Sequence, residues 1–352
     1  MIHLIQKFQL ILVICLPQVL NKKFKYYYSE GMMHQQRFTV LVLMFFLALM
    51  EVSSHAKDYN NWNWVRPIKQ TFRVTNVTFG QKQFVAVGEH GTVLTSSDGI
   101  TWSIVKLGVE KEISGIAYGN GVFVAVGEDG VIFRSIDGVQ WVKISSPVKN
   151  RLEDVLYANG KFTAVGYYGT IVSSVDGDEW VKIPSPTGNI LDGIAYGPKG
   201  YVVAGWNSIL HSTDGVIWEN QKVDGILFKI AFGNGAYVIA SKLGIYTSAD
   251  GYDWDRTFFM LEKDEYFGGE SPASFGDVRY LDGKFIAVGS KYLTSETGKD
   301  WKEHTAAKVG SIAFGNNVFI GILNSSTTST SADAFTWKTN SQPAIPAAAV
   351  TA

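Results

Sequence analysis

Ser96-Ser97-Asp98-Gly99-Ile100-Thr101-Trp102 is the stretch that decides the fold, because the chain repeats it six more times. The later copies read SIDGVQW (135–141), SVDGDEW (174–180), STDGVIW (212–218), SADGYDW (248–254), SETGKDW (295–301) and SADAFTW (331–337). Successive tryptophans are 39, 39, 38, 36, 47 and 36 residues apart. A regular spacing of this length indicates repeats that each form one supersecondary unit and stack on their neighbours.

Each repeat contains four short apolar runs separated by turn residues. The second repeat shows them best, as IAYGNGVFVAVGEDGVIFRS from Ile116 to Ser135, followed by the run that Trp141 opens. Asn-Gly and Asp-Gly between apolar runs indicate tight hairpins, because these turns need positive φ. Four strands, here called A to D from the centre outward, in about 40 residues are typical of a propeller blade. We predict an all-β fold over residues 57–340: a seven-bladed β-propeller of four-stranded antiparallel blades.

Composition agrees with a β-rich protein. Of 352 residues, 18% are charged, 13% are aromatic and 36 are glycine, with a formal net charge of -1. These values exclude a disordered chain, a coiled coil and a strongly basic nucleic-acid binder. The single cysteine, Cys15, excludes a disulfide framework and a zinc–thiolate site. His90, His211 and His304 show no paired spacing, so we predict no metal and no cofactor.

The N-terminal region has the features of an export signal. Residues 38–50, FTVLVLMFFLALM, are apolar and follow Arg37, and Ser54-His55-Ala56 forms a small-x-small cleavage site. This run is short for a membrane span but suits a signal peptide. We predict a signal peptide at 32–56, cleavage after Ala56, and a secreted or periplasmic protein, with residues 1–31 an over-extended start.

Cleavage at this point changes the expected properties of the mature chain. It leaves 26 basic and 30 acidic residues and removes Cys15, which argues further against nucleic-acid binding. We expect a monomer with no stable membrane span and a flexible tail at 341–352. An alternative takes Phe8–Leu16 as a second membrane element, although its shortness, Lys7 and Pro17 argue against it.

The repeated motif itself is predicted to be structural. Serine and aspartate side chains hydrogen-bond nearby backbone groups, glycine permits the turn, and tryptophan packs. Copies spread around a ring cannot converge on one ligand. The residues assigned to this role are Asp98, Asp137, Asp176, Asp214, Asp250, Asp333, Trp102, Trp141, Trp180, Trp218, Trp254, Trp301 and Trp337.

The motif resembles the Asp-box (BNR) repeat of sialidase-like propellers, although that repeat has one more residue between Asp and Gly. The phrase AYGNGxFVAVGxxGxIxxSxDGxxW also resembles bacterial secreted members of the photosystem II assembly/stability factor family. The resemblance covers about residues 62–338 and implies a propeller fold, which hydrolases, assembly factors and uncharacterised proteins share. The sixth copy has Thr297 in place of Asp, and the seventh has Ala334 in place of Gly.

Candidate binding residues lie where the repeats differ. In a propeller the B–C turns and D–A connections share one face, and the C–D turns lie on the other. Along the chain the B–C turns pass from acidic to aromatic to basic, and a longer D–A connection at about 258–274 carries Tyr266. Exposed aromatic residues flanked by charge are typical of peptide or glycan binding. We predict a binding face for an unknown protein or glycan, with ordinary solvated turns as the alternative: Glu89, His90, Glu128, Asp129, Tyr167, Tyr168, Trp206, Lys242, Lys291, Tyr292 and Tyr266.

The sequence provides no catalytic set. A sialidase needs clustered arginines with a tyrosine, a glutamate and an acid/base, and we find no convincing arginine trio. Asp154, Lys229, Asp277 and Arg279 replace small residues at strand A starts and are expected to form ion pairs in the channel. We therefore predict a non-catalytic binding or assembly module. The alternative is a glycoside hydrolase of sialidase-like type.

Overall fold

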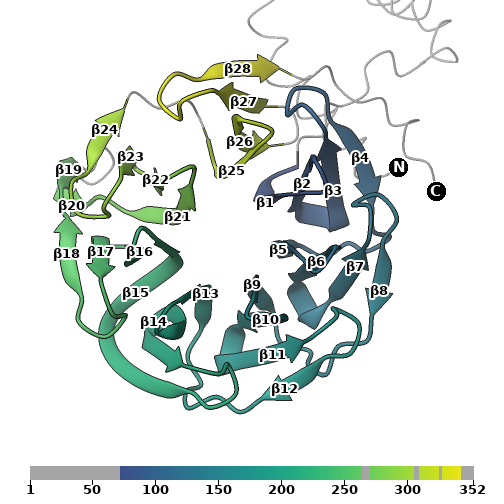
Figure 1. Cartoon of the computed structure of the whole chain (residues 1–352), viewed down its shortest axis with the longest axis horizontal. Helices are drawn as coiled ribbons and strands as arrows, with labels where there is room; N and C mark the ends of the chain where they lie inside the picture. Colours follow the sequence, from purple (N-terminus) through teal and green to yellow (C-terminus); the bar gives the residue numbers. More distant parts are fainter. Residues whose placement is uncertain (1–71, 264–269, 305–308, 325–326, 342–352) are drawn as a thin grey trace, which may run out of the picture. The chain divides into compact units, whose positions relative to one another are not determined.

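A computed structural model describes residues 72–263, 270–304, 309–324 and 327–341. The predicted signal peptide and cleavage site, most of the tail, and Tyr266 lie outside these residues. The described elements are antiparallel strands and three short 3-10 turns, and the sheets surround a central axis (Figure 1). This confirms an all-β propeller with four-stranded antiparallel blades. Within the described ranges, no helix is long and apolar enough to cross a membrane.

Five repeats form separate four-stranded sheets, each ordered along the chain. In the first, Phe84 of strand B pairs with Phe79 of strand A and with Ser96 of strand C. Strands of the first, second and third repeats are β1 (Val74–Gly80), β2 (Gln83–Gly88), β3 (Thr92–Ser96), β4 (Ser103–Lys106), β5 (Ile113–Gly119), β6 (Val122–Gly127), β7 (Ile132–Ser135), β8 (Val142–Ile144), β9 (Leu152–Ala158), β10 (Lys161–Gly166), β11 (Thr170–Ser174) and β12 (Val181–Ile183). Those of the sixth and seventh repeats are β21 (Phe275–Leu281), β22 (Lys284–Gly289), β23 (Tyr292–Ser295), β24 (Lys302–His304), β25 (Ser311–Gly315), β26 (Val318–Asn324), β27 (Thr327–Ser331) and β28 (Lys338–Ser341).

The fourth and fifth repeats share one six-stranded sheet. Its strands are β13 (Leu191–Gly197), β14 (Gly200–Ser212), β15 (Glu219–Gly233), β16 (Ala236–Ser241), β17 (Gly244–Ser248) and β18 (Asp255–Phe258). The described residues therefore form six large sheets, and the prediction of seven separate blades is wrong. The reason is that strand pairing continues through two connections, although the chain still turns back at Asn207, whose φ is 52°. β14 runs through the B–C turn of the fourth repeat, and β15 pairs first with β14 and then with β16.

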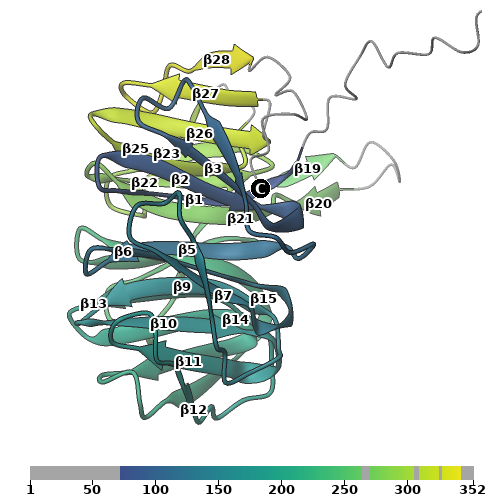
Figure 2. The same cartoon turned by 90° about the vertical axis from the view of Figure 1, so that its right-hand side faces the viewer.

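The ring closes by packing between the last and the first repeat. Their innermost strands, β25 and β1, lie side by side (Figure 1, Figure 2). Strand A of most repeats ends in an aromatic residue and a glycine, and the glycine leaves room for the next repeat's ring. A Cβ on Gly119 would lie 2.0 Å from the Tyr157 ring, and one on Gly315 would lie 2.2 Å from the Phe79 ring. The contact that closes the ring therefore packs a glycine against an aromatic ring in the same way as a contact between consecutive repeats.

The repeated Ser-x-Asp-Gly-x-x-Trp turns are held by their own backbone. In the first copy the Asp98 carboxylate accepts the N–H groups of Ile100 and Thr101, each at 2.8 Å. The Trp102 indole N–H donates to the Gly99 carbonyl at 3.0 Å. These contacts recur in the later copies that keep the aspartate, except that the Trp218 indole nitrogen has no partner among the described residues. The seventh copy keeps them with Ala334 at a φ of 67°.

Stability should fall in acid because of these aspartates. Backbone N–H hydrogen bonds lower the pKa of each motif aspartate, that of Asp333 to about 2. Since the folded pKa lies below the ordinary 3.8, the stabilisation is full above pH 3.8 and is lost as pH falls toward about 2. We expect the melting temperature, followed by circular dichroism, to drop across that window and the drop to be smaller in Asp333→Asn. The exposed aspartate variant Asp224→Asn should keep the wild-type profile, and a flat wild-type profile would contradict the argument.

Candidate binding site at the channel mouth

In the first six repeats, backbone hydrogen bonds tie the B–C turn to the segment that enters strand A. The N–H of Glu89 donates to the Arg73 carbonyl at 3.1 Å, and the N–H of Tyr167 donates to the Arg151 carbonyl at 2.9 Å. Trp206 makes the same bond, at 2.9 Å, to the residue before β13. B–C turns and D–A connections therefore share one face of the ring, as expected. We call this the B–C face.

Three of these turns share one backbone geometry, which partly buries the first side chain of the turn and exposes the second. They are the 3-10 turns η3 (Glu89–Gly91), η4 (Glu128–Gly130) and η5 (Tyr167–Gly169). The first residue of each is partly buried, and the second has a left-handed backbone and is exposed. The second residues are His90, Asp129 and Tyr168, and Tyr168 is 73% exposed.

Trp206 reaches the same face from the continuous strand β14, where Asn207 takes the left-handed conformation. The Trp206 side chain is 40% exposed. Tyr167 instead packs inward, with its ring centroid 6.0 Å from the Arg151 guanidinium. Of the three aromatic residues predicted at the centre of the face, Tyr168 and Trp206 are therefore the ones that a partner can reach.

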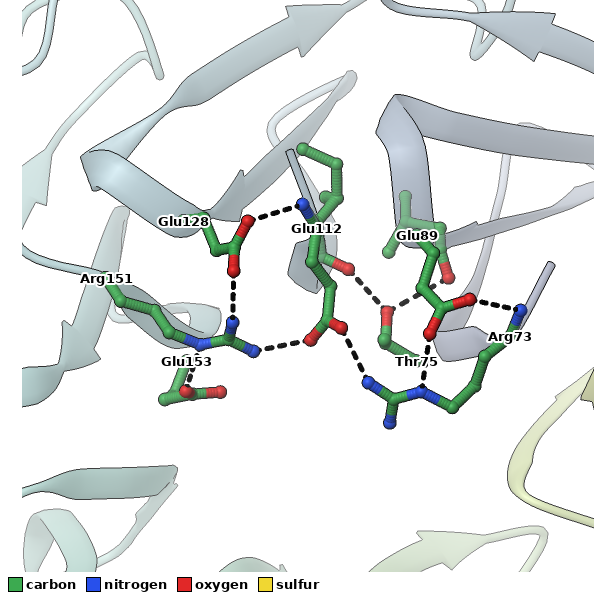
Figure 3. A network of polar contacts seen from close by, with 9 residues as sticks. Arg73, Thr75, Glu89, Glu112, Glu128, Arg151 and Glu153 are labelled. Carbon is green, nitrogen blue, oxygen red and sulfur yellow. Dashed lines mark hydrogen bonds and ion pairs between the residues drawn. The ribbon is translucent and has the colours of Figure 1, made fainter. Parts of the chain in front are cut away.

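A chain of ion pairs runs along the channel side of this face (Figure 3). Arg73 lies 3.3 Å from Glu89 and 2.6 Å from Glu112. Beside them, Thr75 donates its hydroxyl to backbone carbonyls at 2.5 and 3.0 Å, which links β1 to β5 and β2. Glu112 thus joins the first repeat to the arginine of the third.

Arg151 continues the chain and is surrounded by carboxylates. It lies 2.5 Å from Glu112 and 3.3 Å from Glu128, and it also pairs with Glu153 (Figure 3). Burial alone would lower the pKa of Arg151, but the hydrogen bonds that its guanidinium donates to Glu153 and Glu112 raise it above its usual range. The guanidinium therefore stays charged at the centre of the network.

The expected ion pairs inside the channel are present. The Lys229 ammonium lies 3.6 Å from Asp154 and donates to the backbone carbonyls of Glu153 and Asp192. Arg279 lies 3.0 Å from Asp277. These groups neutralise one another, as predicted for charged residues at strand A starts.

A cavity of about 500 Å³ opens between these groups. Arg73, Arg151 and Arg279 all line it, although the sequence showed no convincing arginine trio. The three come from the first, third and sixth repeats and meet only because the ring closes. Each guanidinium already forms an ion pair with at least one carboxylate, so the three arginines are not free to bind a substrate carboxylate. Among the described residues, no group of three or more His, Cys, Asp or Glu side chains could hold a metal ion.

The sequence contains a signal for this ion-pair network, although it lies outside the repeated motif. Arg73, Glu112 and Arg151 follow one another at 39-residue intervals, the period of the repeats. Glu89 and Glu128, each the first residue of its B–C turn, are also 39 residues apart. Residues one period apart occupy equivalent places in neighbouring blades, so alternating charge at one repeat position indicates an ion-pair ladder around the axis.

The remaining predicted residues are not brought together. Tyr292 is only 1% exposed, because it opens β23 and its hydroxyl donates to the Ala334 carbonyl, so its assignment to the binding face is wrong. Lys291 lies 3.0 Å from Glu303 on the neighbouring strand. Lys242 is exposed on its own turn. The long D–A connection contains a two-stranded ribbon, β19 (Leu261–Lys263) and β20 (Glu270–Pro272), and the Tyr266 assignment lies outside the described residues.

Solved structures of similar shape are found for the chain. YCF48 bound to D1 peptide is 16% identical, with a TM-score of 0.55 over 75% of this chain and 92% of that one. YCF48 from Cyanidioschyzon merolae is 18% identical, with a TM-score of 0.54 over 73% and 94%. The chain folds as a β-propeller.

A third similar structure is PorZ of Porphyromonas gingivalis, a component of the type-IX secretion system. It is 11% identical, with a TM-score of 0.55 over 78% of this chain and 38% of that one. At these identities the likeness concerns the fold. No protein family matches the chain, and no curated protein matches its sequence.

Proposed function

We propose that the protein is a non-catalytic binding or assembly module that captures an exposed segment of a partner protein on its B–C face. The observation that carries the proposal is the presentation of Tyr168 and Trp206. Both rings stand exposed in consecutive repeats on turns that backbone hydrogen bonds hold, beside a charged channel mouth. Rigid aromatic anchors next to charged groups are frequent binding hot spots. Because the turns are held in place, little ordering cost would be incurred on binding.

A protein partner is favoured over a glycan. One of the propellers of similar fold is YCF48 bound to D1 peptide, so a propeller of this shape can hold a peptide. The resemblance of the repeat phrase to photosystem II assembly factors points the same way. We further propose that the protein acts after export, as a secreted or periplasmic monomer. N-terminal sequencing of the mature chain tests the export, because cleavage of the signal peptide should leave a chain that starts at Lys57.

The test uses a phage-displayed library of random linear peptides selected against the protein. Selected peptides should lose at least about tenfold in affinity with Tyr168→Ala and with Trp206→Ala, as expected for hot-spot aromatics. The melting temperature should stay nearly unchanged, because both side chains are exposed. Fluorescence anisotropy with synthetic copies of the peptides measures the affinity.

Tyr252→Ala is the matched control, since Tyr252 is an exposed aromatic residue on a C–D turn of the opposite face. It should leave peptide affinity unchanged. If no peptide is enriched, or if the peptides bind the Tyr168 and Trp206 variants as well as the wild type, the proposed function is wrong.

A further inference from the structure

We infer that Asp192 is a positioning residue for Trp206, and that the ionised form of its carboxylate holds the indole ring for partner capture. This inference rests on the proposed function and adds a pH dependence to it. It is drawn from the place of Asp192 in the strand register, from its contacts with both aromatic turns, and from a buried carboxylate oxygen that lacks a partner.

Asp192 lies at a β-bulge beside the turn that carries Trp206. The pairing of β13 with β14 shifts register between Leu191 and Gly193, so Asp192 is the extra residue. The N–H of Trp206 donates to the Ile190 carbonyl at 2.9 Å, which fixes the turn next to this bulge. Bulges change the direction of a side chain and are frequent beside functional sites.

The same bulge brings side chains to the channel mouth in the first three repeats. Strand A has a register shift there in each repeat, and the extra residues are Thr75, Ser114 and Glu153, one period of 39 residues apart. All three line the cavity. Asp192 follows Glu153 by the same 39 residues and takes this position in the fourth repeat. It is the copy whose own B–C turn carries an exposed tryptophan.

The negative charge of Asp192 is only partly compensated. One of its carboxylate oxygens is buried and has no hydrogen-bond partner in the described part of the chain. Burial raises its pKa to about 7, Lys229 of β15 opposes the rise, and Glu153 and Asp154 of β9 add to it. Lys229 is also shared, because it lies 3.6 Å from Asp154 and donates to two backbone carbonyls. Asp192 therefore changes its charge close to neutral pH.

Both aromatic B–C turns lie beside this carboxyl group. The Trp206 side chain hydrogen-bonds Asp192 and opposes the rise of its pKa. The donor is the indole N–H, since tryptophan has no other side-chain donor. In η5, burial raises the pKa of the Tyr167 hydroxyl, and the charges of Glu153 and Asp192 add to the rise.

The charge of Asp192 decides how firmly the indole is held. A hydrogen bond to an ionised acceptor is roughly twice as strong as a bond between neutral groups. Protonation of Asp192 therefore weakens the contact that fixes the Trp206 ring. Because a ring that is already fixed loses less conformational entropy on binding, the partner should bind more tightly when Asp192 is ionised.

The free protein tests the positioning without any partner. Heteronuclear NMR of isotope-labelled protein resolves the indole N–H groups, and the signal missing in Trp206→Phe identifies Trp206. We expect this signal to shift with pH, with a midpoint near pH 7. The shift should disappear in Asp192→Asn, which cannot ionise. It should persist in His90→Gln, which removes an exposed histidine of the same face.

Peptide capture tests the consequence. A selected peptide that contains no histidine is acetylated and amidated, so that only the protein titrates near neutral pH. We expect the wild type to bind it roughly threefold to tenfold more tightly at about pH 8 than at about pH 6. Asp192→Asn and Trp206→Phe should both lose this difference, and His90→Gln should keep it.

Asp192→Asn should keep the fold, because asparagine has the shape of aspartate and removes a partly buried charge. Its melting temperature at about pH 6, where wild-type Asp192 is mostly protonated, should match that of the wild type. At this pH it should also bind the peptide as well as the wild type does. A variant that binds more weakly than the wild type at both pH values would contradict the inference.

The outcomes separate this inference from the proposed function. If peptides bind through Tyr168 and Trp206 with one affinity across this pH range, the inference is wrong and the proposed function stands. The same holds if the Trp206 indole signal titrates equally in Asp192→Asn, or if peptides bind more tightly at low pH. If no peptide binds at all, the proposed function is wrong and the inference fails with it.

Discussion

Replacing Trp180 by alanine is expected to lower the free energy of unfolding by about 3–5 kcal/mol, the usual cost of truncating a core tryptophan. Trp180 is 8% exposed and packs in a cluster with Phe162 and Leu152. Val124, from the preceding repeat, belongs to the same cluster. The loss should therefore weaken the contact between two blades as well as one turn.

The indole also holds its own turn, because its N–H donates to the Gly177 carbonyl at 2.9 Å. Trp180→Phe keeps most of the packing and loses this bond, so it should cost much less, about 1–2 kcal/mol. Urea unfolding followed by fluorescence and circular dichroism measures both variants. A Trp180→Ala protein as stable as Trp206→Ala, whose ring is exposed, would refute a structural role for the motif tryptophans.

Gly315→Val should prevent clean closure of the ring and destabilise the protein by at least about 1–3 kcal/mol, as expected for overpacking a core. Gly315 has no room for a side chain, because a Cβ there would lie 2.2 Å from the Phe79 ring of the first repeat. The same interface buries Val77 against Ala313. Hydrogen exchange should show the fastest opening in β1 and β25.

Two matched variants separate closure from a general effect of valine. Gly119 packs against an internal neighbour, because a Cβ there would lie 2.0 Å from the aromatic ring of Tyr157 in the next repeat. Gly119→Val should therefore destabilise the protein by a similar amount, but hydrogen exchange should be fastest in β5 and β9. Gly188→Val has nothing within 4 Å of its new Cβ and should be nearly neutral. Equal exchange patterns in Gly315→Val and Gly119→Val would contradict closure by local packing.

Strands and turns were predictable because their causes are local. Apolar runs of a few residues, separated by Asn-Gly and Asp-Gly, specify hairpins within one repeat. The contacts of Asp98 span only two or three residues, so the motif alone indicates them. The misplacement of Tyr292 shows the limit, since a shift of the turn by one residue moves a side chain from the surface into the core.

The merged sheet and the candidate site required the tertiary structure. The fourth B–C turn has Ser208 where the first three turns have glycine, but only the structure shows that β14 includes this turn, with β13 paired to its first half and β15 to its second. The charges of the channel mouth meet across blades, and Arg279 donates to Asn76, which lies 203 residues earlier in the chain. By itself the sequence determined which strands and hairpins form, because these depend on neighbouring residues. Only the closed ring decided which charged side chains share a cavity, because their separation depends on packing between distant repeats.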